Sequence, residues 1–431
     1  MRDIQKNFAN CSRTLKHDIA YIEEKYYEAL CSNSKYNLIE VNIKNFRYYN
    51  AKHGYDGGND IINEIYNVLL SFLFHKEYVA HIAADTFVML LQFEDMHTFI
   101  YQRMFDLIEQ AYRTKNEKIE RNIFLSYGVY EMKDKKVGFY DAWNYACICR
   151  KESSGLATRC HSIEVHEQPI YNQYIHRMDL EIKTADAYKN YEFIAYLQPK
   201  IDLKTDKIYG AEALLRWIDE DGNFIPLSEF LPILNKNSYI ELVDLDIFDQ
   251  MCKVLDERIK MNKPIVPISF NISKTSFYTD NIVQKYRNIF KQYKIPKEYI
   301  EIELMESISL DDTEHMKKIV SEFKKYGFQC SLDDFGNGYS SFNVLLNAQF
   351  DTVKMDRQFF MENLKGNHKL VIQTVINLIH SLHMKVVAEG VEQEEHIHYL
   401  KECGCDYVQG FYYYEAMNTE AFYNILEEQW S

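Results

Sequence analysis

Residues 193–218, FIAYLQPKIDLKTDKIYGAEALLRWI, contain two apolar stretches separated by a short polar link. We predict one strand over 193–202 and a second over 208–218, joined by the segment KTDK at 204–207. Parallel strands need a crossover of about a dozen residues or more, whereas antiparallel strands can be joined by a tight hairpin. The short link therefore predicts that the first strand runs antiparallel to the second.

Strands and helices alternate from this hairpin to the end of the chain. The segments between the later strands are long enough for helices, for example TEHMKKIVSEFKKYG and NHKLVIQTVINLIHSLH. Eight strands within about 250 residues is the size of an α/β barrel. The sequence thus predicts a TIM-like (β/α)8 barrel with an antiparallel first strand. The six further strands are predicted at 265–273, 300–305, 328–334, 350–355, 384–389 and 407–412.

The residues before about 170 follow a different pattern, which is typical of a small α+β domain. A polar helix within 1–30 precedes an apolar strand that ends near Val41, and two helical stretches then cover about 44–74. The segment YVAHIAADTFVMLLQ resembles a hairpin and is followed by a predicted helix at 95–114, a strand at 123–132, a helix at 137–152 and a strand at 162–167. We therefore predict three parts: an N-terminal helix over 1–31, an α+β domain over 32–168 and the barrel over 169–431.

Charge and composition exclude several classes of protein. The formal net charge is −15, whereas binding to DNA or RNA polymers normally requires a basic surface. The nine cysteines form no disulfide framework, and no apolar signal segment follows a basic start, so we expect a cytoplasmic protein. No segment reaches the roughly 18 apolar residues that a membrane helix requires, so we expect no membrane span.

Polar side chains recur where the predicted barrel strands end. The stretch SLDDFGNGYSS at 331–341 ends a strand with adjacent Asp333 and Asp334, which repel each other when buried unless a cation lies beside them. Taken singly, such a residue is more often a cap or a loop anchor than a ligand. Together these residues are predicted to lie at one rim, where barrel enzymes have their active sites. The others are Glu212, Asn271, Glu303, Glu306, Lys354, Glu389 and Gln409.

This predicted rim is rich in oxygen ligands. Carboxylates and amide oxygens suit hard divalent ions such as Mg²⁺ or Mn²⁺, whereas zinc or copper would favour His or Cys. The number of acids exceeds the need of one ion, and a pair of ions about 3.5–4 Å apart suits phosphodiester hydrolysis. In this interpretation, the adjacent Asp333 and Asp334 serve two neighbouring ions.

Seven motifs in the second half resemble, in order and spacing, the EAL-domain cyclic di-GMP phosphodiesterases. The motifs are EALLRW, FNIS, ELMES, DDFGNGYSS, VKMD, AEGVE and QG, and the match covers about residues 170–428. The resemblance implies a barrel with an antiparallel first strand. It also implies hydrolysis of cyclic di-GMP to linear pGpG with two Mg²⁺ or Mn²⁺ ions.

The resemblance further implies a role for each matching residue. Lys354 would orient the attacking water, Glu389 would act as the general base, and Glu212 would belong to the same catalytic set. Glu306 resembles the residue that anchors the loop after the fifth strand. One ion would be held by Glu212, Asn271, Glu303 and Asp333, and the other by Asp333, Asp334 and Glu389. Substrate contacts would come from Gln198, Leu214, Arg216, Asp356 and Gln409. Asn337 replaces the threonine usual in DFGTG, which puts dimer-coupled control of metal binding in doubt.

Residues 32–165 resemble a degenerate GGDEF domain. Its signature is AADTF at 83–87, with Thr86 in place of one metal-binding acid and Asn42 in place of another. Cyclase chemistry needs carboxylates that hold Mg²⁺ on a triphosphate, so we expect no diguanylate cyclase activity. The two positions of the inhibitory RxxD motif are Phe74 and Glu77, so we expect no product inhibition there. This half would serve dimerisation or regulation.

Several alternatives stay open. The main one is a receptor that binds cyclic di-GMP without cleaving it, although such receptors usually lose several metal ligands and this chain keeps them all. In a second interpretation the first half binds GTP and activates the barrel. A third is an α/β barrel with an unrelated substrate. The family also implies a homodimer.

Overall fold

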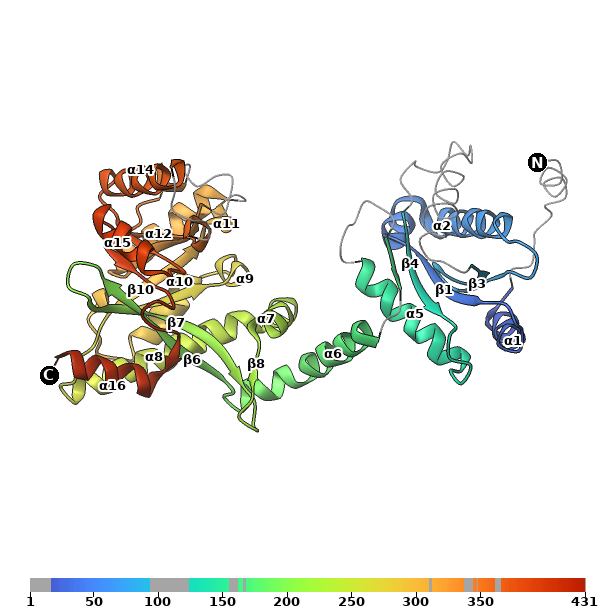
Figure 1. Cartoon of the computed structure of the whole chain (residues 1–431), viewed down its shortest axis with the longest axis horizontal. Helices are drawn as coiled ribbons and strands as arrows, with labels where there is room; N and C mark the ends of the chain where they lie inside the picture. Colours follow the sequence, from blue (N-terminus) through green and yellow to red (C-terminus); the bar gives the residue numbers. More distant parts are fainter. Residues whose placement is uncertain are drawn as a thin grey trace. The chain divides into compact units, whose positions relative to one another are not determined.

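The computed structural model describes residues 17–93, 124–154, 162–165, 168–309, 312–336, 344–346, 348–360 and 366–430. The chain divides into two compact units, Met1–Met178 and Asp179–Ser431, and the division falls within helix α6 (Gln168–Lys189) (Figure 1). Within the described ranges, no helix is both long and apolar enough to cross a membrane. The domain limits at 31 and 168 remain predictions.

The first unit contains a five-stranded sheet in the order β2-β3-β1-β4-β5. Strand β1 pairs antiparallel with β3 and β4, β2 pairs antiparallel with β3, and β4 pairs parallel with β5. The predicted hairpin is thus the β2–β3 pair. The strands are β1 (Tyr36–Ile43), β2 (Tyr78–Ala83), β3 (Thr86–Gln92), β4 (Leu125–Glu131) and β5 (Ser162–Val165).

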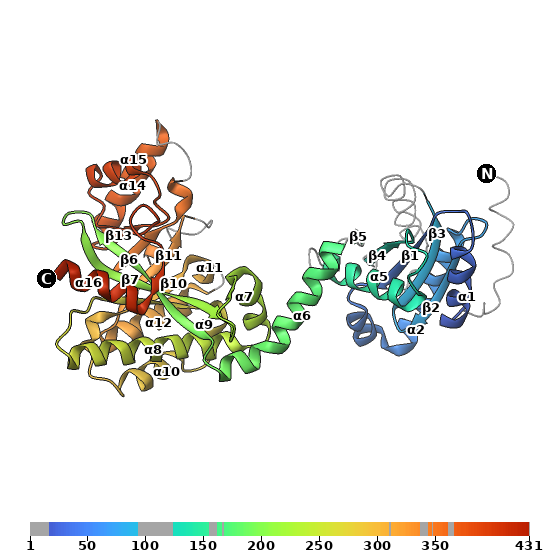
Figure 2. The ribbon, with the colours of Figure 1, turned by 60° about the horizontal axis from the view of Figure 1, so that its bottom comes forward.

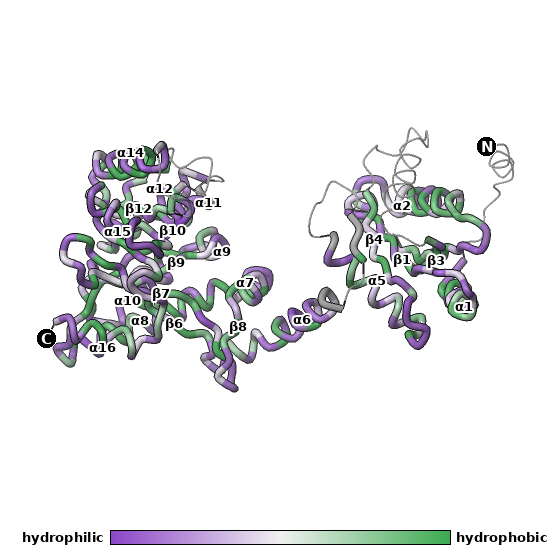
Figure 3. Tube along the Cα trace, in the orientation of Figure 1, coloured by the Kyte–Doolittle hydropathy of each residue, from purple (hydrophilic) through white to green (hydrophobic). Residues whose placement is uncertain are grey.

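Helices cover both faces of this sheet. Strand residues such as Val41 pack with α2 (Phe46–Ser71) on one face, whereas Leu38 packs with α1 (Ile19–Leu30) and α5 (Phe139–Ser154) on the other. Figure 3 shows the hydrophobic stretches of α1 and α2. Helix α2 is interrupted at Gly54, whose φ of +74° suits glycine because it lacks a Cβ atom, so the two predicted helical stretches are present. The predicted helix at 95–114 lies outside the described residues.

The second unit is a closed eight-stranded barrel. Strand β6 pairs antiparallel with β7 on one side and with β14 on the other, and the remaining ring neighbours are parallel. The predicted antiparallel first strand is therefore confirmed. The ring strands are β6 (Phe193–Asp202), β7 (Lys207–Ile218), β9 (Ile268–Ile272), β10 (Ile300–Met305), β11 (Gln329–Phe335), β12 (Thr352–Met355), β13 (Lys385–Ala388) and β14 (Tyr407–Val408).

The last barrel strand is shorter than the sequence predicts. It ends at Val408 instead of residue 412, because the chain turns at Gly410, whose carbonyl accepts the amides of Tyr413 and Tyr414 at 3.2 Å each. A Cβ atom at Gly410 would lie 2.2 Å from the Val391 carbonyl oxygen, so only glycine fits this close approach. Two short strands, β8 (Phe224–Ile225) and β15 (Met417–Asn418), add to β7 and β6.

Helices surround the barrel, and α8 and α10 lie beside each other on its outside (Figure 2). Helix α12 shows how the sequence sets their limits: Asp312 Oδ1 accepts the His315 amide at 2.9 Å at its start, and Gly327 ends it at φ +107°. The helices are α7 (Leu227–Lys236), α8 (Tyr239–Lys260), α9 (Lys274–Phe277), α10 (Ile282–Phe290), α11 (Glu306–Ser309), α12 (Thr313–Tyr326), α14 (Asn367–Ser381), α15 (Glu394–Glu402) and α16 (Thr419–Trp430), with 3₁₀ turns η3 (Lys297–Tyr299) and η4 (Arg357–Phe360).

Side-chain alternation separates an apolar layer from a polar barrel interior. Along β10, Ile300, Ile302 and Leu304 belong to the apolar core shared with the helices. Glu301 and Glu303 lie between them and are also buried. Because successive strand residues point to opposite sides, both glutamates face the barrel interior.

Candidate active site

The ammonium group of Lys354 on β12 lies at the centre of four carboxylates. Its Nζ atom is 3.1 Å from Glu212 Oε2, 2.7 Å from Glu303 Oε2, 3.0 Å from Asp333 Oδ1 and 2.7 Å from Glu389 Oε1. Only 1% of the lysine side chain is exposed. Burial alone would lower the pKa of Lys354, but the four carboxylates raise it well above its ordinary value, so the group stays charged.

These side chains come from different strands and meet at one end of the barrel. Glu212 lies on β7, Glu303 on β10, Asp333 on β11, and Glu389 directly follows β13. From β9, Asn271 Nδ2 donates to Glu212 Oε1 at 2.6 Å, which leaves the amide oxygen of Asn271 available as a ligand. The structure therefore brings the predicted strand-end residues together at the carboxyl-terminal ends of the parallel strands, the usual place of a barrel active site.

Asp333 and Asp334 are adjacent in β11, and adjacent residues of a regular strand point to opposite sides. In a regular strand they could therefore not both face the site. The pairing of β11 with β12 shifts register between Leu332 and Phe335, and Asp334 has a left-handed backbone with φ +58°. A bulge of this kind re-aims side chains next to active sites. As a result, carboxylate oxygens of Asp333, Asp334 and Glu389 lie within 4.8 Å of one another.

The electrostatics of this acidic trio favour a cation. Burial and the neighbouring Asp333 and Asp356 raise the pKa of Asp334 to about 6, and burial with nearby carboxylates raises the pKa of Glu389 well above its ordinary value. Among the described residues, Asp333 Oδ1 is buried and accepts no aligned hydrogen bond, although Lys354 lies 3.0 Å away. An all-oxygen donor set with a buried acceptor left over fits Mg²⁺ or Mn²⁺.

The predicted substrate residues line the same end of the barrel. Gln409 Nε2 donates to Glu212 Oε2 at 2.7 Å and to Gln198 Oε1 at 3.0 Å, so both glutamines are tied to the carboxylate cluster. Arg216 and Leu214 lie beyond Glu212 on the same face of β7, and Arg216 lies 5.9 Å from the ring centroid of Tyr196. A guanidinium group at a rim suits an anionic or aromatic ligand.

Two further predicted residues lie near the end of β11. Glu306 Oε2 accepts the Gly336 amide at 2.9 Å, which fixes the point where the chain leaves this strand. Asp356 Oδ1 accepts the Gln358 amide at 2.8 Å, and its carboxyl group lies beside that of Asp334. Asn337 lies outside the described residues.

Lys200 also lies in this site, although the strand-end pattern did not predict it. This lysine lies on β6, is 2% exposed, and its Nζ contacts Glu303 Oε1 at 2.8 Å. The signal available was its spacing: Lys200 follows Gln198 by two residues in a strand, so both side chains face the same side. A lysine at that depth is otherwise rare unless a carboxylate pairs with it.

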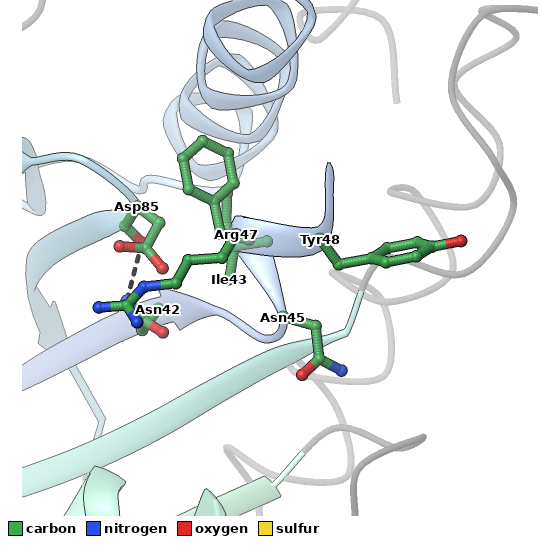
Figure 4. A pocket seen from close by; sticks show the side chains of 7 residues that line it. Asn42, Ile43, Asn45, Arg47, Tyr48 and Asp85 are labelled. Atoms are coloured by element: carbon green, nitrogen blue, oxygen red, sulfur yellow. Dashed lines mark hydrogen bonds between the residues drawn. The ribbon is translucent and has the colours of Figure 1, made fainter. Parts of the chain in front are cut away.

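The first unit has a pocket at the ends of β1 and β3, lined by Asn42, Asn45, Arg47 and Asp85 among others (Figure 4). Asn42 and Thr86 are cross-strand partners, and Asn42 Nδ2 donates to Thr86 Oγ1 at 3.2 Å and to the Asp85 carbonyl at 3.3 Å. Neutral groups thus satisfy each other where the GGDEF resemblance would place two acids. At the other end of β3, away from this pocket, the carboxylate of Glu77 accepts hydrogen bonds from the amides of Phe74 and Gln92 at 2.8 Å each.

Two family models match this chain. The model described as "EAL domain" matches residues 183–416, more than half of the chain, and the model described as "Diguanylate cyclase, GGDEF domain" matches residues 19–146. The signaling protein YkoW of Bacillus subtilis is 24% identical over 398 residues, which cover 90% of this chain and 49% of YkoW. The probable cyclic di-GMP phosphodiesterase PdeB of Escherichia coli is 30% identical over 243 residues, which cover 56% of this chain and 46% of PdeB. The chain therefore spans about half the length of these curated relatives.

Solved structures with the same barrel include the PaMucR phosphodiesterase in complex with c-di-GMP. It is 27% identical with a TM-score of 0.54, and the match covers 57% of this chain and 99% of that chain. An EAL domain protein from Listeria monocytogenes EGD-e is also 27% identical, with a TM-score of 0.50 and coverage of 56% and 96%. The FimX EAL domain from Pseudomonas aeruginosa, bound to c-di-GMP, is 20% identical with a TM-score of 0.52, which shows the shared fold.

Proposed function

Because this chain belongs to the EAL domain family, we propose that its barrel hydrolyses cyclic di-GMP to linear pGpG with two divalent ions. The observation that carries this proposal is the group of Asp333, Asp334 and Glu389 beside the buried Lys354. These carboxylates can carry more negative charge than one lysine neutralises. They also lie at the end of the barrel where barrel enzymes bind their substrates.

One ion would be held by Asp333, Asp334 and Glu389, and the other by Glu212, Asn271, Glu303 and Asp333. When bound, two such ions supply Lewis-acid activation of water and a charge clamp for the phosphodiester. Glu389 would take the proton of the attacking water, and Lys354, whose Nζ lies 2.7 Å from Glu389 Oε1, would orient that water. Gln198 and Arg216, on neighbouring strands, would contact guanine and phosphate, with Leu214, Asp356 and Gln409 around them.

The test is to incubate the purified chain with cyclic di-GMP in Mg²⁺, in Mn²⁺ and in chelator, and to follow pGpG by chromatography. The expected result is product in the presence of either ion and none with chelator. The variant Glu212→Ala should lose turnover, because it removes a carboxylate from the cluster, whereas Glu220→Ala, at an exposed position, should retain it. Undiminished hydrolysis by Glu212→Ala would contradict the metal assignment. Binding without product in any metal would make the barrel a receptor instead.

We propose that the first unit is inactive as a diguanylate cyclase and serves regulation or dimerisation. The support is the Asn42–Thr86 hydrogen bond, since neither side chain offers the negative charge that Mg²⁺ on a triphosphate requires. The test uses the Glu212→Ala variant of the full chain, so that the barrel does not hydrolyse any cyclic di-GMP that forms. Incubation of this variant with GTP and Mg²⁺ should yield no cyclic di-GMP. Accumulation of cyclic di-GMP there would refute the proposal. Saturable GTP binding without turnover would instead support a regulatory nucleotide site.

The homodimer that the family implies is also a proposal for this chain. Light scattering of the full chain at micromolar concentration should give twice the mass of 51.3 kDa. A single species at the monomer mass under these conditions would refute the homodimer.

A further inference from the structure

A second lysine lies beneath the Lys354 cluster in the barrel interior. Lys200 Nζ donates to Ser269 Oγ at 2.8 Å, to Glu301 Oε2 at 3.2 Å and to Glu303 Oε1 at 2.8 Å. Its side chain is 2% exposed, and those of Glu301 and Glu303 are 6% and 0% exposed. These groups form a buried ionic network rather than an isolated buried charge, and Glu301 Oε1 is its one oxygen among these residues that accepts no hydrogen bond.

The strand register places this network one layer deeper than the candidate metal ligands. Ser269 and Asn271 lie two residues apart on β9, and their partners on β10 are Glu301 and Glu303. Residues two apart on a strand face the same side, so Ser269 and Glu301 lie directly below Asn271 and Glu303. On β6, which runs in the opposite direction, Gln198 pairs with Glu212 at the upper level, and Lys200 therefore reaches the lower one.

Glu303 joins the two layers because its two carboxylate oxygens have different partners. Lys200 holds Oε1 from below, and Lys354 contacts Oε2 at 2.7 Å from above. Burial alone would raise the pKa of Glu303, but the two ammonium groups lower it below its ordinary range. With Oε1 engaged by Lys200, only Oε2 is directed toward the upper layer.

We propose that Lys200 is a positioning residue that fixes Glu303 so that this ligand presents a single oxygen to a divalent ion. Ser269 and Glu301 in turn hold the Lys200 ammonium in place. This inference rests on the proposed two-ion site, but it concerns a residue that contacts neither the ions nor the substrate in that proposal. Groups that orient a metal ligand typically change metal affinity by about 10–100-fold when removed.

Whether removal of Lys200 weakens or strengthens divalent-cation binding distinguishes a positioning role from simple charge balance. Lys200 carries a positive charge close to the ligand Glu303, and like charges repel. If Lys200 only balanced charge, its removal would leave binding of a cation unchanged or make it tighter. If it positions Glu303, removal frees Oε1 and weakens cation binding despite the lost repulsion.

The test measures Mn²⁺ binding to the full chain directly, by the free-Mn²⁺ signal in electron paramagnetic resonance. Lys200→Met keeps the aliphatic stem and should weaken binding at the tighter site by about 10-fold or more. Lys385→Met is the matched control, since Lys385 lies on the barrel strand β13, is about half-exposed and pairs with Asp406 at 2.8 Å; it should bind like the wild type. Hydrolysis by Lys200→Met should recover when Mn²⁺ is raised, with KM for cyclic di-GMP unchanged.

Equal or tighter Mn²⁺ binding by Lys200→Met would overturn the inference. If the single variant does not fold, Lys200→Met combined with Glu301→Gln removes one charge of each sign and frees Glu303 Oε1 in the same way. The same 10-fold weakening is expected for that pair, and wild-type affinity would again overturn the inference. Absence of Mn²⁺ binding by the wild type would instead refute the proposed metal-dependent function, so the two failures are distinguishable.

Discussion

Replacing Lys354 by methionine should destabilise the barrel in chelator and make its stability depend on a divalent cation. The structure sets the size of this effect, because Lys354 Nζ lies 2.7–3.1 Å from four carboxylates and is 1% exposed. Removing one partner of a buried ion pair costs about 3–5 kcal/mol. Burial raises the pKa values of Glu212 and Glu389, and these carboxyl groups can take up protons when the lysine is lost. We therefore expect the variant to lose about 3 kcal/mol of unfolding free energy, the lower end of this range.

A loss of this size is measurable by differential scanning calorimetry of the full chain. For a unit of about 250 residues, 1 kcal/mol moves the unfolding midpoint by about 2–4 °C, so the shift should be about 6–12 °C. Mn²⁺ at about 100 times its dissociation constant stabilises a folded protein by about 2.7 kcal/mol. The variant should gain more than the wild type from Mn²⁺, because the ion also replaces the missing positive charge. The transition that responds to Mn²⁺ identifies the barrel.

Lys385→Met again provides the control, because Lys385 is about half-exposed and the buried Asp406 keeps the Val386 amide as a donor at 3.0 Å, so we expect a loss of at most about 1 kcal/mol. An unchanged midpoint of Lys354→Met in chelator would refute the view that Lys354 neutralises the cluster. Equal gains from Mn²⁺ in variant and wild type would show that the ion binds elsewhere.

Two more predictions concern groups around the site. Burial raises the pKa of Asp244 from 3.8 to about 6, although Ser276 and Ser273 donate to it. Between these values the folded chain holds a proton that the unfolded chain has released, so the contribution of Asp244 is fully present below pH 3.8 and is lost as pH rises through 6. Relative to wild type, Asp244→Asn should gain about 2–3 kcal/mol in unfolding free energy from pH 4 to pH 7, and parallel pH curves would contradict this. Glu306→Ala removes the acceptor of the Gly336 amide, so hydrogen exchange at that amide should rise about 10–150-fold, since a hydrogen bond to a charged group contributes about 1.5–3 kcal/mol. Unchanged protection would show that Glu306 does not anchor the loop.

The sequence was sufficient for the barrel because its evidence is local. A link of four residues can only form a hairpin, and this property fixed the antiparallel direction of β6. The common position of the polar residues at strand ends could likewise be predicted from the sequence, since parallel strands that form one barrel must end at one rim. The length of β14 could not be predicted in this way. Its early end depends on the packing of Gly410 against Val391, which comes from another part of the sequence.

The sequence alone thus determined which residue types could bind metal and in what order they follow along the strands. It also determined that positions 42 and 86 carry the neutral residues Asn42 and Thr86. Only the tertiary structure decided that Lys354 faces four carboxylates at once and that a bulge turns Asp333 and Asp334 toward Glu389. Only it revealed that Lys200 reaches Glu303 across 103 positions of the chain. The physical reason is that strand periodicity specifies which side a residue faces, whereas the depth at which side chains from different strands meet depends on barrel closure and register.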